Sequence, residues 1–150
     1  MKFDHLGVVV RNLAAGRQLL GRSIGVGDWS REQEDPLQDV RIQFGRCGSG
    51  ICYEIIAPRS DESPISRVLA NKVNVINHVA YLVDDLRREA VRLETLGFVS
   101  VGPAKPGVAF GNRSVQFFVS PSRFLLELIE APNHRHAFGG VAEFAAEALV

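Results

Sequence analysis

"FDHLGVVVRNL" (residues 3–13) decides the fold, because its pattern returns as "INHVAYLVDDL" (76–86). Both stretches have a histidine in third place, then alternating apolar residues, a polar pair and a leucine. His5 and His78 are 73 residues apart (78 − 5), and so are the two closing leucines (86 − 13). Self-similarity at a fixed offset indicates repeated structural units. The sequence therefore predicts two copies of one module in tandem.

The same offset relates the far ends of the two copies. "CYEIIAP" (52–58) matches "LLELIEAP" (125–132), and Glu54 and Glu127 are again 73 residues apart (127 − 54). Glu127 lies in the most apolar part of a short, strand-like segment. Burying an unpaired ionised carboxylate is costly, so this carboxylate must be paired, metal-bound or protonated.

Each copy predicts the element order β-α-β-β-β. Asn12 and Asp85 are suitable N-caps, the first for a helix over 13–24 that ends near Gly25, the second for a helix closed by Gly97. The second helix has an apolar stripe formed by Leu86, Ala90, Leu93 and Leu96. Alternation and β-branched residues predict the strands that follow the helices, at 27–34, 38–46, 50–57, 98–104, 113–119 and 123–130.

A chain of 150 residues suits one domain. We predict an α+β fold whose parts are module one (1–57), a connector (58–74), module two (75–132) and a C-terminal tail (133–150). A short helix is expected in the connector from Ser63, before Pro64, and another in the tail from Val141.

Charge and composition limit the partners. Seventeen basic residues balance seventeen acidic ones, so no net field favours nucleic acid or a membrane surface. The apolar run at the N-terminus meets Arg11 and is too short for a signal peptide or a transmembrane helix. We expect a cytoplasmic protein with no nucleic-acid or membrane partner, in which Cys47 and Cys52, flanking a turn-like "GSG", are free thiols.

The two histidines and two glutamates predict a metal site. Two modules packed about a pseudo-twofold axis bring equivalent positions together in pairs, if the first and last strands lie side by side in a curled sheet. A mixed set of imidazoles and carboxylates suits divalent Zn, Mn, Co, Ni or Fe, and four protein ligands leave two octahedral positions open. The alternative is a module that keeps these residues for structure. His134 and His136, in "NHRH", are interpreted as solvated loop residues, and Glu130 as a rim or surface carboxylate.

At these residues the sequence resembles the vicinal oxygen chelate superfamily, which includes glyoxalase I, extradiol dioxygenases and antibiotic-resistance proteins. Within it the chain is most similar to methylmalonyl-CoA epimerases. The resemblance lies in "DHLGVVV", "YEIIAPRSDESPI", "INHVAYLVDDL", "GNRSVQFFVSP" and "LLELIE", spread over residues 4–130. It implies a cup-shaped mixed sheet with helices outside, and a homodimer.

The resemblance carries the family's metal ligands onto His5, Glu54, His78 and Glu127. In the epimerases a metal holds the thioester and carboxylate oxygens of a CoA substrate, and the proton between the two carbonyl groups is exchanged. Glu127 is then a candidate catalytic base. Gly107, Gly111 and Arg113, with Lys105, lie in "KPGVAFGNR", which resembles the substrate-bordering loop and also fits a simple turn. The chain has Ile42 near the position where some epimerases carry a catalytic glutamate; Asp39 is the nearest carboxylate.

Three functions follow from this resemblance. The first is a metal-dependent isomerase acting on a methylmalonyl-CoA-like thioester. The second is a glyoxalase I-like lactoylglutathione lyase or another metal-dependent lyase, and the third is a non-catalytic small-molecule-binding protein of the resistance type. Dioxygenases generally use two histidines and one carboxylate, so a fourth ligand from Glu54 argues against that chemistry.

Overall fold

The computed structural model describes residues 1–71 and 76–139. These residues form one open, ten-stranded mixed sheet with strand order β2-β4-β5-β1-β6-β10-β9-β7, in which β3 pairs with β4 and β8 with β9. The first half contains β1 (Lys2–Val9), α1 (Leu13–Ile24), β2 (Val26–Trp29), β3 (Gln33–Asp35), β4 (Val40–Cys47) and β5 (Cys52–Pro58). After α2 (Pro64–Ala70), the second half contains β6 (Ile76–Leu82), α3 (Leu86–Thr95), β7 (Val99–Ser100), β8 (Lys105–Gly107), the 3-10 helix η1 (Val108–Phe110), β9 (Arg113–Val119) and β10 (Leu125–Ile129).

The strand pairing confirms the repeat residue by residue. At the centre of the sheet, β1 and β6 run antiparallel and Leu6 pairs with Val79, its own equivalent in the repeat (79 − 6 = 73). On either side of this pair, His5 faces Ala80 and Gly7 faces His78. The pseudo-twofold axis therefore passes through the Leu6–Val79 pair, and each histidine lies one step from it.

The first and last strands of each half lie side by side, as expected. β1 pairs parallel with β5, placing Gly7 beside Glu54, and β6 pairs parallel with β10, placing Ala80 beside Glu127. Because side chains alternate along a strand, the two histidines and two glutamates project from the same, inner face of the curved sheet.

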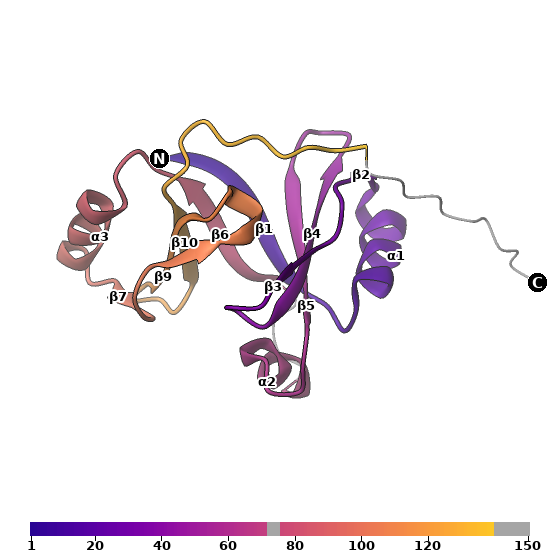
Figure 1. Ribbon diagram of the computed structural model, residues 1–150, viewed down its shortest axis with the longest axis horizontal. Coiled ribbons are helices and arrows are strands. Elements are labelled where there is room, and N and C mark those ends of the chain that lie inside the picture. The colour runs from indigo at the N-terminus through magenta and orange to yellow at the C-terminus, as the bar shows by residue number, and fades with distance from the viewer. Residues whose placement is uncertain (72–75, 140–150) are drawn as a thin grey trace, which may run out of the picture.

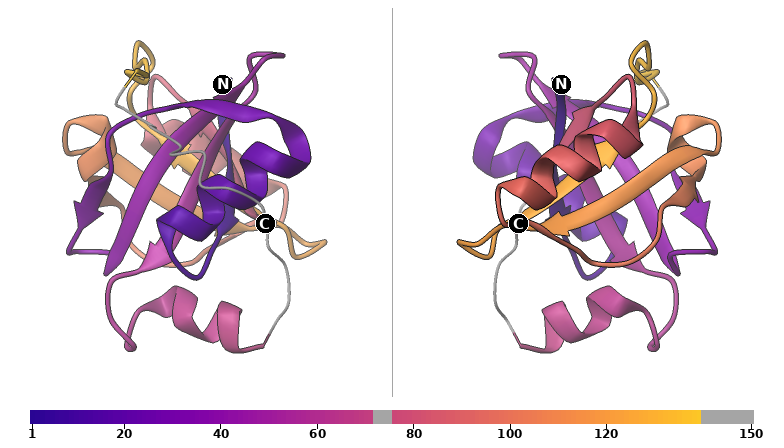
Figure 2. Two further views of the ribbon diagram at one scale, coloured as in Figure 1. Left: turned by 90° about the vertical axis from the view of Figure 1, so that its right-hand side faces the viewer. Right: turned by 90° about the vertical axis from the view of Figure 1, so that its left-hand side faces the viewer.

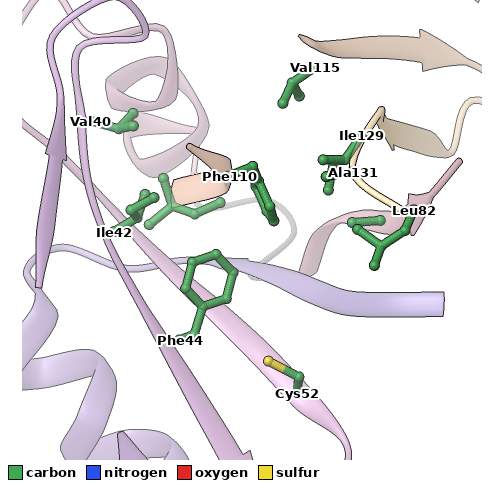
Figure 3. Packing of buried hydrophobic residues seen from close by; sticks show 11 residues of the cluster. Val40, Ile42, Phe44, Cys52, Leu82, Phe110, Val115, Ile129 and Ala131 are labelled. Carbon is green, nitrogen blue, oxygen red and sulfur yellow. The ribbon is translucent and has the colours of Figure 1, made fainter. Parts of the chain in front are cut away.

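The helices cover the outer face of the sheet. Figures 1 and 2 show α1 against the first half and α3 against the second, at opposite ends of the molecule. Each helix buries an apolar cluster, with Leu13 and Leu20 contributed by α1 and Leu86 and Leu93 by α3. The inside of the cup holds a third cluster, in which Figure 3 shows Phe110 between Ile42 and Ile129.

Most helix boundaries follow the sequence signals. The Asn12 side chain accepts a hydrogen bond from the Ala15 N–H at 2.8 Å, and the Asp85 side chain caps α3 in the same way. Gly25 ends α1 with φ of 72°. The stripe predicted for α3 is wrong at Leu96, which is 56% exposed because the helix ends at Thr95. The Ser63 side chain makes no cap hydrogen bond to α2, although Pro64 does begin that helix.

The strands predicted directly after the helices are wrong in detail. The segment 27–34 divides into β2 and β3, because the Ser30 hydroxyl accepts the Phe44 N–H at 3.0 Å and interrupts the backbone ladder beside β4. The segment 98–104 likewise shortens to β7, where the Ser100 hydroxyl bonds to the carbonyl of Gly102.

Other expectations have simpler outcomes. Cys47 and Cys52 are free, as predicted. In the described ranges, none of the helices has the length and apolar character needed to cross a membrane. The tail helix expected from Val141 lies outside the described residues.

Candidate metal centre

Four buried side chains, one from each of the four central strands, meet inside the cup. They are His5 on β1, Glu54 on β5, His78 on β6 and Glu127 on β10, and none is more than 7% exposed. One ligand atom from each lies within 4.8 Å of all the others. The structure thus brings together the four residues that share the 73-residue offset.

The spacing of these atoms matches a coordination shell. His5 Nε2 lies 3.1 Å from His78 Nε2, 3.4 Å from Glu54 Oε2 and 3.2 Å from Glu127 Oε2. His78 Nε2 lies 3.4 Å from Glu54 Oε2 and 3.1 Å from Glu127 Oε2. With bonds of about 2.1 Å, neighbouring ligands are about 3.0 Å apart in an octahedral shell and about 3.4 Å apart in a tetrahedral one.

The hydrogen bonding inside the cluster also fits a cation. Glu127 Oε2 is fully buried and has no hydrogen-bond partner, although two imidazole nitrogens lie beside it. An isolated buried carboxylate oxygen is costly, and a divalent ion at the centre of the cluster would satisfy it. Two neutral imidazoles and two carboxylates form a donor set suited to divalent Zn, Mn, Co, Ni or Fe.

Without an ion, the cluster balances its charge by protonating the imidazoles. Burial opposes a charge on His5, but the Glu54 charge and a hydrogen bond to Asp4 outweigh it and raise the pKa of His5 well above its ordinary value. Burial likewise opposes a charge on His78, and the Glu127 carboxylate overcomes it and raises the pKa of His78. Burial would raise the pKa of Glu54, but His5 and His78 lower it to about 2.

A glycine makes room for one of the histidines. A Cβ atom on Gly7 would lie 2.1 Å from Cε1 of His78 and 2.4 Å from its Nδ1. His78 can therefore occupy the centre only because residue 7 has no side chain. Glycine within a strand often marks such a close approach, and this is the sequence signal that points to Gly7.

The second ring nitrogen of each histidine is held by the residue before it. His5 Nδ1 lies 2.8 Å from Asp4 Oδ2, and His78 Nδ1 lies 3.1 Å from Asn77 Oδ1. Asp4 and Asn77 are also 73 residues apart (77 − 4). Such partners fix the tautomer and orientation of metal-binding histidines, so Nδ1 carries the proton and Nε2 faces the centre.

The interpretation of His136 as a solvated residue is wrong. Its side chain is 9% exposed, its Nε2 lies 2.8 Å from Asp4 Oδ2, and its ring stacks on Phe44 with centroids 4.0 Å apart. His134 is half-buried beside it, with Nε2 3.4 Å from His136 Nδ1. Glu130 has a structural contact: its Oε1 accepts the Leu86 N–H at 3.0 Å, at the start of α3.

A cavity of about 410 Å³ opens onto the centre, lined by Glu54, His78 and Glu127 among mainly apolar side chains. Of the predicted substrate-binding residues, Gly107 lines this cavity, whereas Gly111 and Arg113 are not among its lining residues. Lys105 also lines it. The arrangement offers charged groups at one end of an apolar pocket, which suits a substrate with an oxygen-bearing head.

Ile42 lines the same cavity and provides no acid or base. The Asp39 carboxylate faces the cavity but accepts a hydrogen bond from the Ser60 hydroxyl and lies 3.6 Å from an Arg59 nitrogen. Asp35 accepts the backbone N–H groups of Leu37 and Gln38, each at 3.1 Å. Both aspartates are therefore engaged in local structure.

The profile of the Glyoxalase/Bleomycin resistance protein/Dioxygenase superfamily matches residues 4–117, most of the chain. The chain belongs to this superfamily. Its fold is similar to that of methylmalonyl-CoA epimerase from Mycobacterium tuberculosis, with a TM-score of 0.71 and 25% identity over 85% of this chain and 86% of that one. The described cup, with four ligand-type residues on its inner face, is thus a member of the vicinal oxygen chelate fold, as the repeat predicted.

Two further relatives have no stated activity. The hypothetical protein BH1468 from Bacillus halodurans C-125 superposes with a TM-score of 0.76 at 23% identity, covering 91% of this chain and 98% of that one, which shows the fold alone. The uncharacterized protein YqjC of Bacillus subtilis strain 168 is 25% identical over 138 residues, 90% of this chain and 96% of that protein.

Proposed function

We propose that this superfamily member is a metal-dependent isomerase that exchanges the proton next to a carbonyl group, with a methylmalonyl-CoA-like thioester as substrate. The observation that carries the proposal is the buried cluster of His5, Glu54, His78 and Glu127 at the end of the cavity. The likeness to a methylmalonyl-CoA epimerase supports the choice of substrate class.

The four residues would hold a divalent ion, whose identity among Co, Mn, Ni, Zn and Fe is open. When bound, such an ion supplies Lewis-acid stabilisation for the oxyanion that develops as a proton leaves the neighbouring carbon. The protein keeps the ligand atoms at preset spacing, so little reorganisation is needed when charge develops.

Glu127 is the proposed catalytic base. One of its oxygens has no hydrogen-bond donor, and the charge of His78, working against burial, lowers the pKa of this carboxyl. The group is therefore ionised at neutral pH and has an oxygen free to accept a proton at the floor of the cavity. A positioned base of this kind accelerates proton transfer by about 10²–10⁴-fold.

The cavity wall supports an anionic substrate with an apolar part. Lys105 is a basic residue on the lining, and it would attract a carboxylate or phosphate group. Gly107 brings backbone to the wall without a side chain, and we propose that Gly111 and Arg113 border the substrate beyond it. Ile42, Val115 and Phe117 keep water from the floor of the pocket.

One observation favours a second candidate. Because Ile42 supplies no carboxylate, proton transfer by groups of the metal centre alone is also consistent, as in a glyoxalase I-like lactoylglutathione lyase or another metal-dependent lyase. A non-catalytic small-molecule-binding protein is disfavoured because all four ligand candidates are intact and converge.

The test is incubation of metal-loaded protein with methylmalonyl-CoA in D2O. Deuterium should enter at C2, faster with added Co or Mn. Absence of exchange with every metal would sink the epimerase proposal, and turnover of the methylglyoxal–glutathione hemithioacetal would then support the second candidate.

A further inference from the structure

The segment that follows β10 crosses from the second half of the molecule to the first. Figure 1 shows residues 131–139 running along one edge of the cup from β10 toward β2. At the far end, the Gly139 N–H donates to the Trp29 carbonyl at 3.1 Å, and the Arg46 guanidinium lies 4.5 Å from the centre of the Phe138 ring. We call residues 131–139 the crossing segment.

The crossing segment delivers His136 to the rim of the metal cluster. His136 stacks on Phe44 at an interplanar angle of 28°, which fixes the plane of its imidazole. In that plane its Nε2 lies 2.8 Å from Asp4 Oδ2, and the two side chains are 9% and 6% exposed. A hydrogen bond this short between nearly buried groups is a built contact rather than a passing one on the surface.

The same carboxylate oxygen serves two histidines. Asp4 Oδ2 accepts from His136 Nε2 and from His5 Nδ1, both at 2.8 Å. With His136 donating from Nε2, its Nδ1 is free to accept from His134 Nε2 at 3.4 Å. The donors thus run in one direction, from His134 through His136 to Asp4, and Asp4 in turn holds the proton of His5 on Nδ1.

The second half of the molecule handles its histidine differently. His78 Nδ1 contacts Asn77 Oδ1 at 3.1 Å, so its orienting partner is a neutral amide rather than a carboxylate. The residue equivalent to His136 by the repeat is Ser63 (136 − 73), which lies before α2. The pairing of His136 with Asp4 is therefore an addition to the duplicated fold and not part of the repeat.

We propose that His136 is a positioning residue of the metal centre: it fixes the Asp4 carboxylate, and through it directs the Nε2 lone pair of His5 toward the metal. This inference rests on the proposed metal centre. Removing partners of this type typically weakens metal binding by about 10–100-fold. His5 should be the more strongly oriented and more basic of the two imidazole ligands, because only its partner is anionic.

The experiment compares His136→Ala, His136→Gln, Asp4→Asn and the double variant Asp4→Asn/His136→Ala, with Arg135→Ala, an exposed neighbour, as the matched control. Zinc affinity is measured by chelator competition, and the Co(II) absorption spectrum reports the ligand geometry. We expect about 10–100-fold weaker zinc binding and an altered Co(II) spectrum for His136→Ala. His136→Gln, which keeps a donor, should recover most of the affinity, and Arg135→Ala should match the unaltered protein.

The double variant separates positioning from general stabilisation. If His136 acts through Asp4, the double variant should bind zinc no more weakly than Asp4→Asn alone, because residues in one network are non-additive. Fully additive losses, or unchanged affinity and spectrum in His136→Ala, would overturn the proposal.

A reading of the metal-free protein keeps the two proposals distinguishable. ¹⁵N NMR of the imidazoles reports whether His5 carries its proton on Nδ1. If the unaltered protein binds no metal, the proposed function fails, but loss of the Nδ1–H state of His5 in His136→Gln or His136→Ala would still support the positioning role. An unchanged His5 signal in both variants would overturn it.

Discussion

The Nε2 atoms of His5 and His78, 73 residues apart in the chain (78 − 5), lie 3.1 Å from each other across the β1–β6 pair. The register causes this meeting, because each histidine lies one step from the pseudo-twofold axis and faces a residue with little or no side chain. A duplicated module thus builds from two equal halves a site that neither half contains.

Glu127→Gln should abolish isomerisation while leaving the fold intact. The amide keeps the shape of the side chain but removes the charge that serves as ligand and base, so we expect a loss of about 10²–10⁴-fold in kcat together with weaker metal binding. Steady-state kinetics and metal titration check both effects. Glu130→Gln is the control, because its amide oxygen can still accept the Leu86 N–H; equal losses in both variants would contradict the assigned role of Glu127.

Gly7→Ala should remove metal binding without unfolding the protein. The new Cβ would occupy the place of the His78 ring, 2.1 Å from Cε1, and push the imidazole out of the centre. Gly27→Ala on β2 is the control, because its Cβ would meet nothing within 4 Å. Metal titration and circular dichroism distinguish the two variants. Normal metal uptake by Gly7→Ala would show that His78 is not a ligand in this position.

Metal binding should strengthen as the pH rises. In the metal-free cluster the raised pKa values of His5 and His78 keep protons on the imidazoles, and metal must displace them. The stability contributed by these protonated histidines is complete below their unfolded pKa of about 6.5 and is lost as pH rises through the raised folded pKa.

The metal-induced increase in Tm should therefore be larger at pH 8.5 than at pH 6.0. Differential scanning calorimetry with and without zinc measures it, and the Arg135→Ala variant should behave as the unaltered protein does. An increase that is independent of pH would mean that the imidazoles are already neutral in the metal-free protein.

The order of helices and strands and the four central residues could be predicted from the sequence, because a constant offset survives any local irregularity. His5, Glu54, His78 and Glu127 each look ordinary alone, and only the shared spacing distinguishes them. The same offset relates Asp4 to Asn77, so this pair was also within reach of the sequence.

His136 and the broken strands were beyond such reasoning. His136 lies in a segment without periodicity, and its place on Phe44 depends on how residues 131–139 cross the cup. The segment 27–34 has the composition of one strand, yet the Ser30 hydroxyl takes a backbone donor of β4 and divides it. Such side chain–backbone bonds depend on tertiary neighbours and have no periodic signature.

Titration of the untagged protein with Co(II), followed by absorption and by metal analysis after gel filtration, tests the central claim most directly. The account predicts uptake of one equivalent per chain, with a spectrum typical of mixed nitrogen and oxygen ligands, and loss of that spectrum in Gly7→Ala and in a His5→Ala variant. Uptake below about a tenth of an equivalent, or a spectrum unchanged in both variants, would contradict a metal centre at His5, Glu54, His78 and Glu127.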